Sequence, residues 1–259
     1  MAIEKTAVIT GATSGIGREL AERFAADGYS LFLTARNEAA LKGLCEQFSK
    51  RYPDAEFEYT AADLGRNEDI EKLCNMLSKM KIDVLVNNAG FGMTGEFAYC
   101  DKLQLQEMLT LNMLALTHIT RAVLPYMKEQ KSGRILNVAS IAAFMPNPYG
   151  AVYAATKAYV KSFSEAISEE LRGSGVKVTI LCPGPTKTGF GARSEMDKSL
   201  IFSKGVMAAD RVADLGYAAL QKGKRTVVTG VHNKAIVTAA KLLPMGAVLA
   251  VAALMLKHD

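Results

Sequence analysis

The feature that most constrains the fold is a regular alternation of short apolar runs with longer segments of helical spacing. The apolar runs are rich in aliphatic and β-branched residues and span residues 6–10, 31–34, 56–60, 84–86, 135–138, 178–181 and 226–229. Between them, apolar side chains recur every three or four positions. Strands that alternate with helices form a parallel sheet, and the helices bury it on both faces. We therefore expect an α/β fold with a doubly wound sheet of about seven parallel strands.

The expected helices can be bounded from capping and breaking residues. They cover residues 15–26, from Asn37 to about Pro53, from about Asn67 onward, about 101–131 with Pro125 bending its last turns, about 149–173, and 209–222. No linker rich in Gly, Pro or Ser separates these units. The whole chain, residues 1–259, is therefore expected to form one domain.

The C-terminal extension, residues 235–259, is unusually apolar. Between residues 235 and 256 only Thr238 and Lys241 are clearly polar. Residues 242–256 form a run without a charged side chain, but this run is shorter than the roughly 20 residues that a membrane span needs. Burial is favoured, as a lid on the cleft of a neighbouring subunit or as an oligomer interface, because a large exposed apolar patch is a liability. Contact with a membrane surface is the less favoured alternative, since an interfacial helix normally has a basic face.

Composition excludes several classes of protein. The 49% of hydrophobic residues and 22% of charged residues exclude a disordered chain, and the net charge of +5 comes from scattered side chains rather than a nucleic-acid-binding block. The cysteines lie far apart, and His118 and His232 have no partner pattern, so neither a disulfide scaffold nor a metal site is expected. The N-terminus does not resemble a secretory signal, and a cytoplasmic protein is expected.

A glycine-rich loop, Thr10–Gly17, connects the first strand to the first helix. Glycines allow a tight turn and a close approach to a pyrophosphate, and the helix N-terminus offers free N–H groups. A simple tight turn is the alternative, but the position between strand and helix favours a Rossmann-like dinucleotide site. The expected contacts in this loop are Gly11, Thr13, Ser14, Gly15, Ile16 and Gly17.

The residues after the next strands predict which dinucleotide binds. Arg36 follows the second strand, where an NAD site usually has a carboxylate, so NADP(H) is favoured over NAD(H). Arg36 as an ordinary surface charge is the alternative. After the third strand, Asp63 and Leu64 either contact the adenine or form a turn. Asn88, Ala89 and Gly90, after the fourth strand, are expected to form a wall beside the adenine ribose.

The reacting groups are expected near Tyr153 and Lys157, one helical turn apart on one face. This spacing alone is common by chance, but Ser140 follows the fifth strand, thirteen residues before the tyrosine. Reducing a ketone needs a proton donor and groups that stabilise the forming alkoxide. A nearby lysine is expected to lower the pKa of the tyrosine by Coulomb attraction.

Together these motifs resemble the short-chain dehydrogenase/reductase family over almost the whole chain. The matching residues are Thr10–Gly17, Asp63, residues 87–90, Asn112, Ser140, Tyr153, Lys157 and residues 183–188. The likeness is strongest to the bacterial branch related to the oxidoreductase of D-alanylation operons, and looser to 3-ketoacyl reductases and hydroxysteroid dehydrogenases.

The resemblance implies a role for each matching residue. Ser140 would bind the carbonyl oxygen, Tyr153 would transfer the proton, Lys157 would also hold the nicotinamide ribose, and Asn112 would anchor a water relay to Lys157. Pro183, Gly184, Thr186 and Thr188 would contact the nicotinamide. Residues 189–207 have the composition of a lid, and the expected substrate pocket comprises Phe91, Met93, Phe144, Met145, Phe190 and Met196.

The sequence thus predicts an NADP(H)-dependent oxidoreductase acting on a small-molecule, apolar carbonyl or alcohol substrate. A dinucleotide-binding redox sensor without turnover and a membrane-associated lipid ketoreductase are the alternatives. The intact Ser140, Tyr153 and Lys157 argue against the sensor, which has no need of a proton donor. The resemblance also implies a homodimer or homotetramer formed through the two long helices.

Overall fold

The computed structural model describes residues 5–189 and 206–256, and its centre is a parallel sheet of seven strands. The spatial order is β3-β2-β1-β4-β5-β6-β9. The strands are β1 Thr6–Thr10, β2 Ser30–Ala35, β3 Phe57–Ala61, β4 Val84–Asn87, β5 Gly133–Val138, β6 Val176–Cys182 and β9 Thr226–Val228. The predicted doubly wound α/β fold is confirmed. The strand order reverses between β1 and β4, where ligands of such sheets bind.

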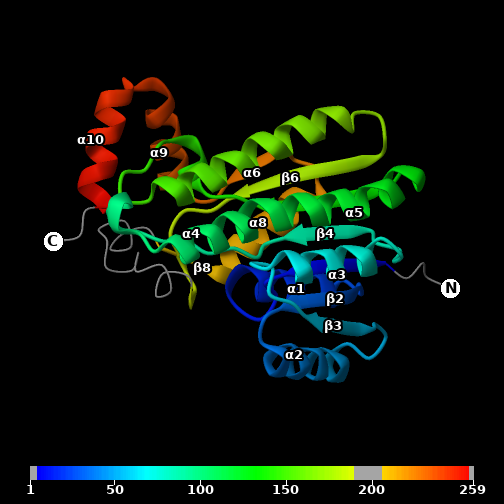
Figure 1. Cartoon of the computed structure of the whole chain (residues 1–259). Coiled ribbons are helices and arrows are strands. Elements are labelled where there is room, and N and C mark those ends of the chain that lie inside the picture. The colour runs from blue at the N-terminus through cyan, green and yellow to red at the C-terminus, as the bar shows by residue number, and fades with distance from the viewer. Residues whose placement is uncertain (1–4, 190–205, 257–259) are drawn as a thin grey trace.

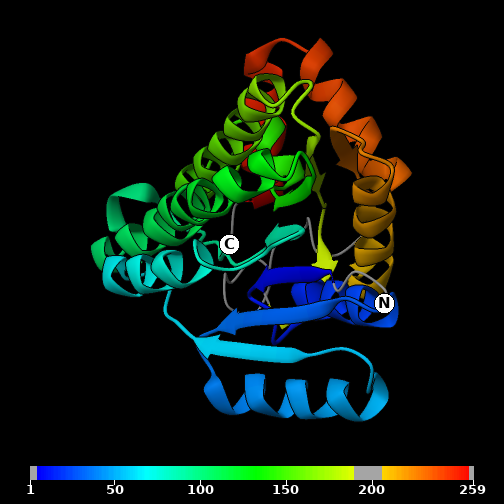
Figure 2. The ribbon, with the colours of Figure 1, turned by 90° about the vertical axis from the view of Figure 1, so that its right-hand side faces the viewer.

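Helices cover both faces of the sheet (Figure 2). One face carries α1 Gly15–Ala26, α2 Glu38–Arg51 and α8 Ala209–Gln221, whose buried side chains form one core cluster. The other carries α3 Asn67–Leu77, α5 Leu116–Glu129 and α6 Ala151–Glu170 over a second cluster. Because both faces are buried, the central strands are apolar without alternation, as the sequence predicted.

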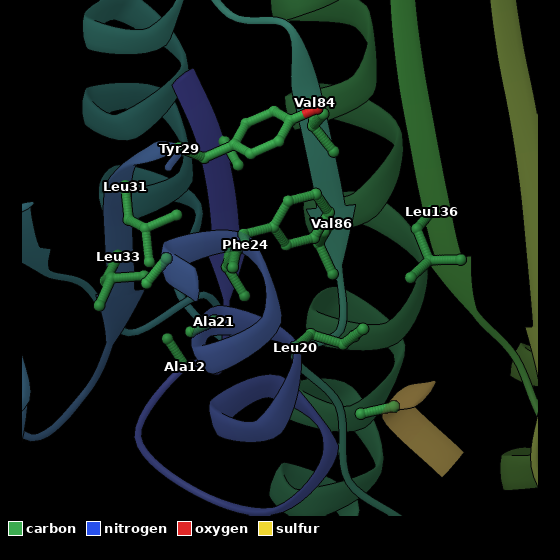
Figure 3. Close-up of a cluster of buried hydrophobic side chains, with 14 of the residues drawn as sticks. Ala12, Leu20, Ala21, Phe24, Tyr29, Leu31, Leu33, Val84, Val86 and Leu136 are labelled. Carbon is green, nitrogen blue, oxygen red and sulfur yellow. The ribbon is translucent and has the colours of Figure 1, made fainter. Parts of the chain in front are cut away.

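The first core cluster fixes α1 against the strands beside the glycine-rich loop (Figure 3). The ring of Phe24 is fully buried and meets Tyr29 edge-on, with 5.2 Å between ring centroids. Its other edge contact is Tyr217 of α8, at 4.8 Å. Burial of one such aromatic side chain is worth about 2–3 kcal/mol. These contacts pack the C-terminal half of α1 against α8 and the segment that enters β2.

The predicted long helix over residues 101–131 is interrupted. It consists of α4 Lys102–Leu109, a π-helical segment η2 Thr110–Ala115, and α5, which contains Pro125. A π-helical turn inside a longer helix shifts the register of its side chains and often marks a functional site. The shift here centres on Asn112, whose hydrogen bonds are described below.

The C-terminal region forms two helices that the sequence did not predict. After α8 and β9 come α9 Val231–Leu242 and α10 Met245–Leu256, joined by a turn at Pro244. Figure 1 shows them at the end of the molecule toward which β6 points. Within residues 5–189 and 206–256, no helix is both long and apolar enough to cross a bilayer. The remaining short elements are η1 Phe97–Tyr99, η3 Ile141–Phe144, β7 Thr186–Lys187 and β8 Met207–Ala208.

Candidate active site

A cleft of about 1160 Å³ lies at the carboxyl ends of the strands. Its lining runs from the glycine-rich loop past the ends of β2 to β6 and on to α9 and α10. Most residues predicted for the site meet in it: Gly11, Thr13, Ser14, Gly15, Ile16, Arg36, Asp63, Leu64, Asn88, Ala89, Gly90, Ser140, Tyr153, Lys157, Pro183, Gly184, Thr186 and Thr188. Gly17 and Asn112 lie outside the lining and support it from behind.

The glycine-rich loop is tied to the segment after β4. The side-chain amide of Asn88 donates to the carbonyl oxygens of Thr10 and Gly11, at 2.9 and 3.1 Å. In return, the Thr10 hydroxyl accepts from the backbone N–H groups of Asn88 and Ala89, both at 3.0 Å. A Cβ at Gly17 would overlap Asn88 Nδ2 and the Gly11 carbonyl oxygen. This glycine is therefore required for the contact between the two loops.

The start of α1 fits a phosphate group. Gly15 has a φ of +55°, and a Cβ there would lie 2.9 Å from Thr188 Cγ2, so the position favours glycine. Ser14, the residue before the helix, makes no capping hydrogen bond through its side chain. The first-turn N–H groups of α1 are thus available to a ligand, and the helix dipole favours an anion there. The cleft accordingly fits the pyrophosphate of a dinucleotide.

The residues at the adenine end have mixed roles. Arg36 is exposed at the end of β2 and lines the cleft. Asn37 caps α2 as predicted, accepting from Ala40 N at 3.0 Å. Asp63 Oδ1 accepts from Gly65 N at 3.0 Å, so Asp63 closes a turn and also lines the cleft. The two interpretations of Asp63 left open by the sequence are thus compatible.

Ser140, Tyr153 and Lys157 converge in the middle of the cleft. Ser140 begins η3, where its hydroxyl oxygen accepts from Ala142 N at 3.1 Å. Tyr153 and Lys157 lie in the first two turns of α6. Lys157 Nζ donates to the carbonyl oxygen of Val138 at 3.0 Å and lies 5.8 Å from the centroid of the Tyr153 ring. All three side chains are at least nine-tenths buried.

Burial dominates the acid–base properties of this group. It raises the pKa of Tyr153 to about 12, although a hydrogen bond with the Ser140 side chain opposes the shift. It also lowers the pKa of Lys157 to about 8. The sequence predicted that Lys157 would lower the pKa of Tyr153, so the direction differs. The physical reason is that desolvation disfavours the charged form of both side chains.

Asn112 joins three segments of the site. Its Oδ1 accepts from Phe91 N at 3.2 Å, and its Nδ2 donates to the Phe91 carbonyl oxygen at 2.9 Å and to Thr156 Oγ1 at 3.0 Å. A Cβ at Gly90 would lie 2.9 Å from Asn112 Oδ1 and 3.4 Å from Lys157 Nζ. Asn112 thus holds the segment after β4 close to the first turns of α6. The predicted water relay stays a prediction.

Only some of the residues predicted for the substrate pocket line the cleft. Met145 lines the cleft. Phe91 and Met93 instead pack on the cluster that contains Tyr153 and Met108. The ring of Phe144 contacts the cations Lys161 and Lys241, at 5.3 and 5.1 Å from Nζ to the centroid. Two further predicted residues, Phe190 and Met196, and the central part of the predicted lid, residues 190–205, lie outside the described residues.

The largest group of cleft residues that the sequence did not predict comes from the C-terminal helices. These residues are His232, Asn233, Ile236, Ala239 and Ala240 of α9, Leu243 directly after it, and Val248, Val251, Ala252 and Met255 of α10. The helices line the cleft of their own chain, whereas the sequence predicted either a lid on the cleft of a neighbouring subunit or an oligomer interface. The oligomer interface stays a prediction. The apolar positions 236, 239, 240 and 243 have helical spacing and repeat at 248, 251, 252 and 255. That repeat is the signal that could have identified them.

Buried Lys157 gives a prediction for stability against pH. Because its pKa in the folded protein is about 8, the unfolded chain binds more protons from there up to the ordinary lysine pKa near 10. Burial also raises the thiol pKa of Cys45 to about 11 and that of Cys182 to about 12, so above about pH 9 the folded protein keeps protons that the unfolded chain loses. The free energy of unfolding should therefore rise only between pH 8 and about 9, by roughly 1 kcal/mol. Above about pH 9 the two thiols reverse the trend, and the raised pKa of Tyr153 adds to the fall above about pH 10.

Urea unfolding across this pH range measures the effect. The expected rise is lost in Lys157→Met, which keeps the length of the side chain and removes the charge. An equal rise in the variant would show that another group causes it.

Comparison with known proteins agrees with this geometry. A sequence model of the family described as short chain dehydrogenase matches residues 5–199. An uncharacterised oxidoreductase of Staphylococcus epidermidis is 32% identical over 213 residues, which covers 79% of this chain and 90% of the relative. A very-long-chain 3-oxoacyl-CoA reductase of Pyricularia oryzae is 34% identical over 179 residues, or 68% of this chain. The aligned part spans about half of that longer relative, 54%.

Solved structures share the fold over most of their length. A short-chain dehydrogenase from Sphingobium yanoikuyae in complex with NADPH has a TM-score of 0.83 and 31% identity, with 92% of both chains covered. A short-chain dehydrogenase/reductase from Burkholderia phymatum in complex with NAD has a TM-score of 0.80 and 27% identity, with the same coverage. The similar proteins therefore bind either dinucleotide.

Proposed function

The chain belongs to the short-chain dehydrogenase family of oxidoreductases, which act on alcohol and ketone groups, and from this premise we propose an NADP(H)-dependent carbonyl reductase. The observation that carries the proposal is the convergence of Ser140, Tyr153 and Lys157 in one cleft with an uncapped, glycine-rich helix start. The substrate is proposed to be a small-molecule ketone or aldehyde with an apolar body.

The side chains divide the chemistry between them. A bound dinucleotide supplies the hydride. The Ser140 hydroxyl donates a hydrogen bond to the carbonyl oxygen, and the Tyr153 hydroxyl donates the proton that this oxygen takes up. With a pKa of about 12, Tyr153 is protonated at neutral pH and ready to act as an acid, which favours the direction of reduction. Lys157 uses one of its three donors on Val138 and keeps the others for the ribose hydroxyls.

Two neighbouring residues, Ala35 at the end of β2 and Arg36 directly after it, support the choice of NADP(H). An NAD site usually has a carboxylate at this position, whereas a 2′-phosphate is bound by a guanidinium. Among the described residues Arg36 forms no ion pair, so its charge is available to the cleft. A hydrogen bond to a charged group contributes about 1.5–3 kcal/mol.

Arg36→Asp is therefore expected to weaken NADPH binding about 10-fold to 100-fold and to leave NADH binding unchanged or stronger. Calorimetric titration with both dinucleotides measures this. Lys50→Asp, with the same change of charge at the far end of α2, is the matched control and should bind both as before. If Arg36→Asp lost affinity for NADPH and NADH equally, the assignment of Arg36 to the 2′-phosphate would be contradicted.

The activity itself is tested by following NADPH absorbance with a panel of aliphatic and aromatic ketones and aldehydes. We expect oxidation of NADPH in stoichiometric proportion to the alcohol formed. Normal NADPH binding without turnover of any carbonyl would instead favour a redox sensor.

We also propose a cytoplasmic homo-oligomer of the bacterial branch that the sequence resembles. All four cysteines are free thiols, which suits a reducing compartment. Leu103, Leu109 and Leu114 are 68%, 41% and 45% exposed along α4 and η2, an apolar row that a second copy would cover. Sedimentation velocity tests the assembly, and a monomer at micromolar concentration would contradict it.

A further inference from the structure

The cleft changes character where it reaches the C-terminal helices. Near the glycine-rich loop its lining mixes polar residues, among them Ser14, Arg36 and Asp63, with apolar ones such as Ile16. Along α9 and α10 the lining beyond Asn233 consists of apolar side chains only: Ile236, Ala239, Ala240, Leu243, Val248, Val251, Ala252 and Met255. Lys241, the basic residue in the last turn of α9, does not line the cleft, and its Nζ lies over the Phe144 ring. This part of the cleft, here called the apolar groove, has no charge among its described residues.

The apolar groove is held firmly to the reacting groups. Asn233 is 2% exposed and donates from Nδ2 to the Thr229 carbonyl oxygen at 2.7 Å. A Cβ at Gly184 would overlap this side chain, so the start of α9 packs directly on the segment after β6. Ile141 N, beside Ser140, donates to the Pro183 carbonyl oxygen at 2.9 Å in the same segment. The groove and Ser140 are therefore positioned by one hydrogen-bonded unit.

The groove has a buried floor and an open rim. Val248 and Ala252 are 5% and 7% exposed, whereas Leu243 and Val251 are 51% and 56% exposed. The small side chain of Ala252 lies on this floor, whereas Ala239 is exposed and belongs to the rim. A buried floor under an exposed apolar rim suits a hydrocarbon ligand, which would remove the rim from water.

We propose that the apolar groove binds a hydrocarbon chain attached to the reacting carbonyl, so that the substrate is a long-chain ketone or aldehyde, and that Ala252 and Val251 determine the preferred chain length. The proposal rests on the reductase function above, because the carbonyl must lie at Ser140 and Tyr153. An uncharged chain is favoured over a charged tail, since burying a charge against these side chains would cost its hydration without a partner.

The first test is a chain-length series of straight methyl ketones, from butanone to tetradecanone, with NADPH. Each methylene that enters the groove should raise kcat/KM about threefold to fourfold until the groove is full. Val251→Asp places a charge on the rim without crowding, and Ala252→Phe fills the floor. Both should flatten the dependence on chain length and keep the affinity for NADPH, which also shows that the variants fold.

Two control variants match these changes outside the groove. Val231→Asp is at a position 84% exposed that does not line the cleft. Ala250→Phe is on the exposed side of α10. Both should keep the wild-type dependence on chain length.

The outcomes separate this inference from the reductase function. If ketones are reduced but kcat/KM does not rise with chain length, or if Val251→Asp keeps the rise, the groove assignment is overturned and the reductase stands. If no ketone is reduced, calorimetry with dodecanone and butanone in the presence of NADPH decides. Tighter binding of dodecanone that Val251→Asp removes supports the groove without the reaction, and equal or absent binding of the two overturns it.

Discussion

Replacing Tyr153 by phenylalanine is expected to lower kcat for carbonyl reduction about 100-fold to 10,000-fold, while NADPH binds as before. The change removes only the phenolic oxygen, which carries the proton for the forming alkoxide. The ring stays in its cluster with Met108, so the fold should be kept. Steady-state kinetics on any ketone that the protein reduces, together with NADPH titration, measures the two effects separately.

Tyr159→Phe is the matched control for this prediction. It makes the same change two turns along α6, where the hydroxyl forms a hydrogen bond of 2.8 Å with Thr117 and the ring stacks on Phe163. Loss of that bond should cost about 1 kcal/mol of stability and little activity. A Tyr153→Phe protein that keeps more than a tenth of its activity would require another proton donor.

Gly17→Ala is expected to remove dinucleotide binding although Gly17 does not line the cleft. The added Cβ would overlap Asn88 Nδ2 and the Gly11 carbonyl oxygen, so the side chain of Asn88 must leave the loop that it holds. The strain should lower stability by about 1–3 kcal/mol. Displacement of the loop should weaken NADPH binding at least about tenfold. Thermal unfolding and NADPH titration measure the two effects.

Gly43→Ala is expected to change the stability of the protein in the opposite direction at a comparable helical position. Gly43 is also in a helix, but no atom lies within 4 Å of a Cβ built there. Alanine should therefore raise stability by about 0.5–1 kcal/mol through its helix propensity and should not affect NADPH binding. If Gly17→Ala also stabilised the protein, the close packing of Asn88 on the loop would be wrong.

The strands and the dinucleotide end could be predicted because their causes are local. Residues 6–10 and 31–34 are apolar without alternation, as strands buried on both faces must be. The glycines of Thr10–Gly17 and the cap at Asn37 act within one turn of the chain. Such features depend on neighbours in sequence, and the structure differs from them by one or two residues at the ends.

The sequence did not predict the C-terminal helices because their apolar residues face two environments, the cleft and the solvent. Val248 and Ala252 are buried toward the cleft, while Leu249 and Leu254 of the same helix are 37% and 70% exposed. With apolar residues all around α10, no polar face marks which side is buried. The helical spacing of the cleft positions is visible only after the exposed residues are set aside.

The substrate pocket was predicted poorly for a similar reason. Phe144 was expected to line it because of its residue type, but Lys161 and Lys241 contact its ring from two other helices. Those partners are far away in the sequence, and only the packing of α6 and α9 brings them together.

The sequence by itself determined the parallel α/β sheet, the glycine-rich loop and the meeting of the three side chains proposed to react, because each depends on short-range spacing and on the common edge where parallel strands end. Only the tertiary structure decided how these groups ionise and what surrounds them. Tyr153 and Lys157 have pKa values of about 12 and about 8 because both are buried, and burial depends on distant segments. The same packing places α9 and α10 on the cleft of their own chain, where an apolar extension becomes one wall of the site.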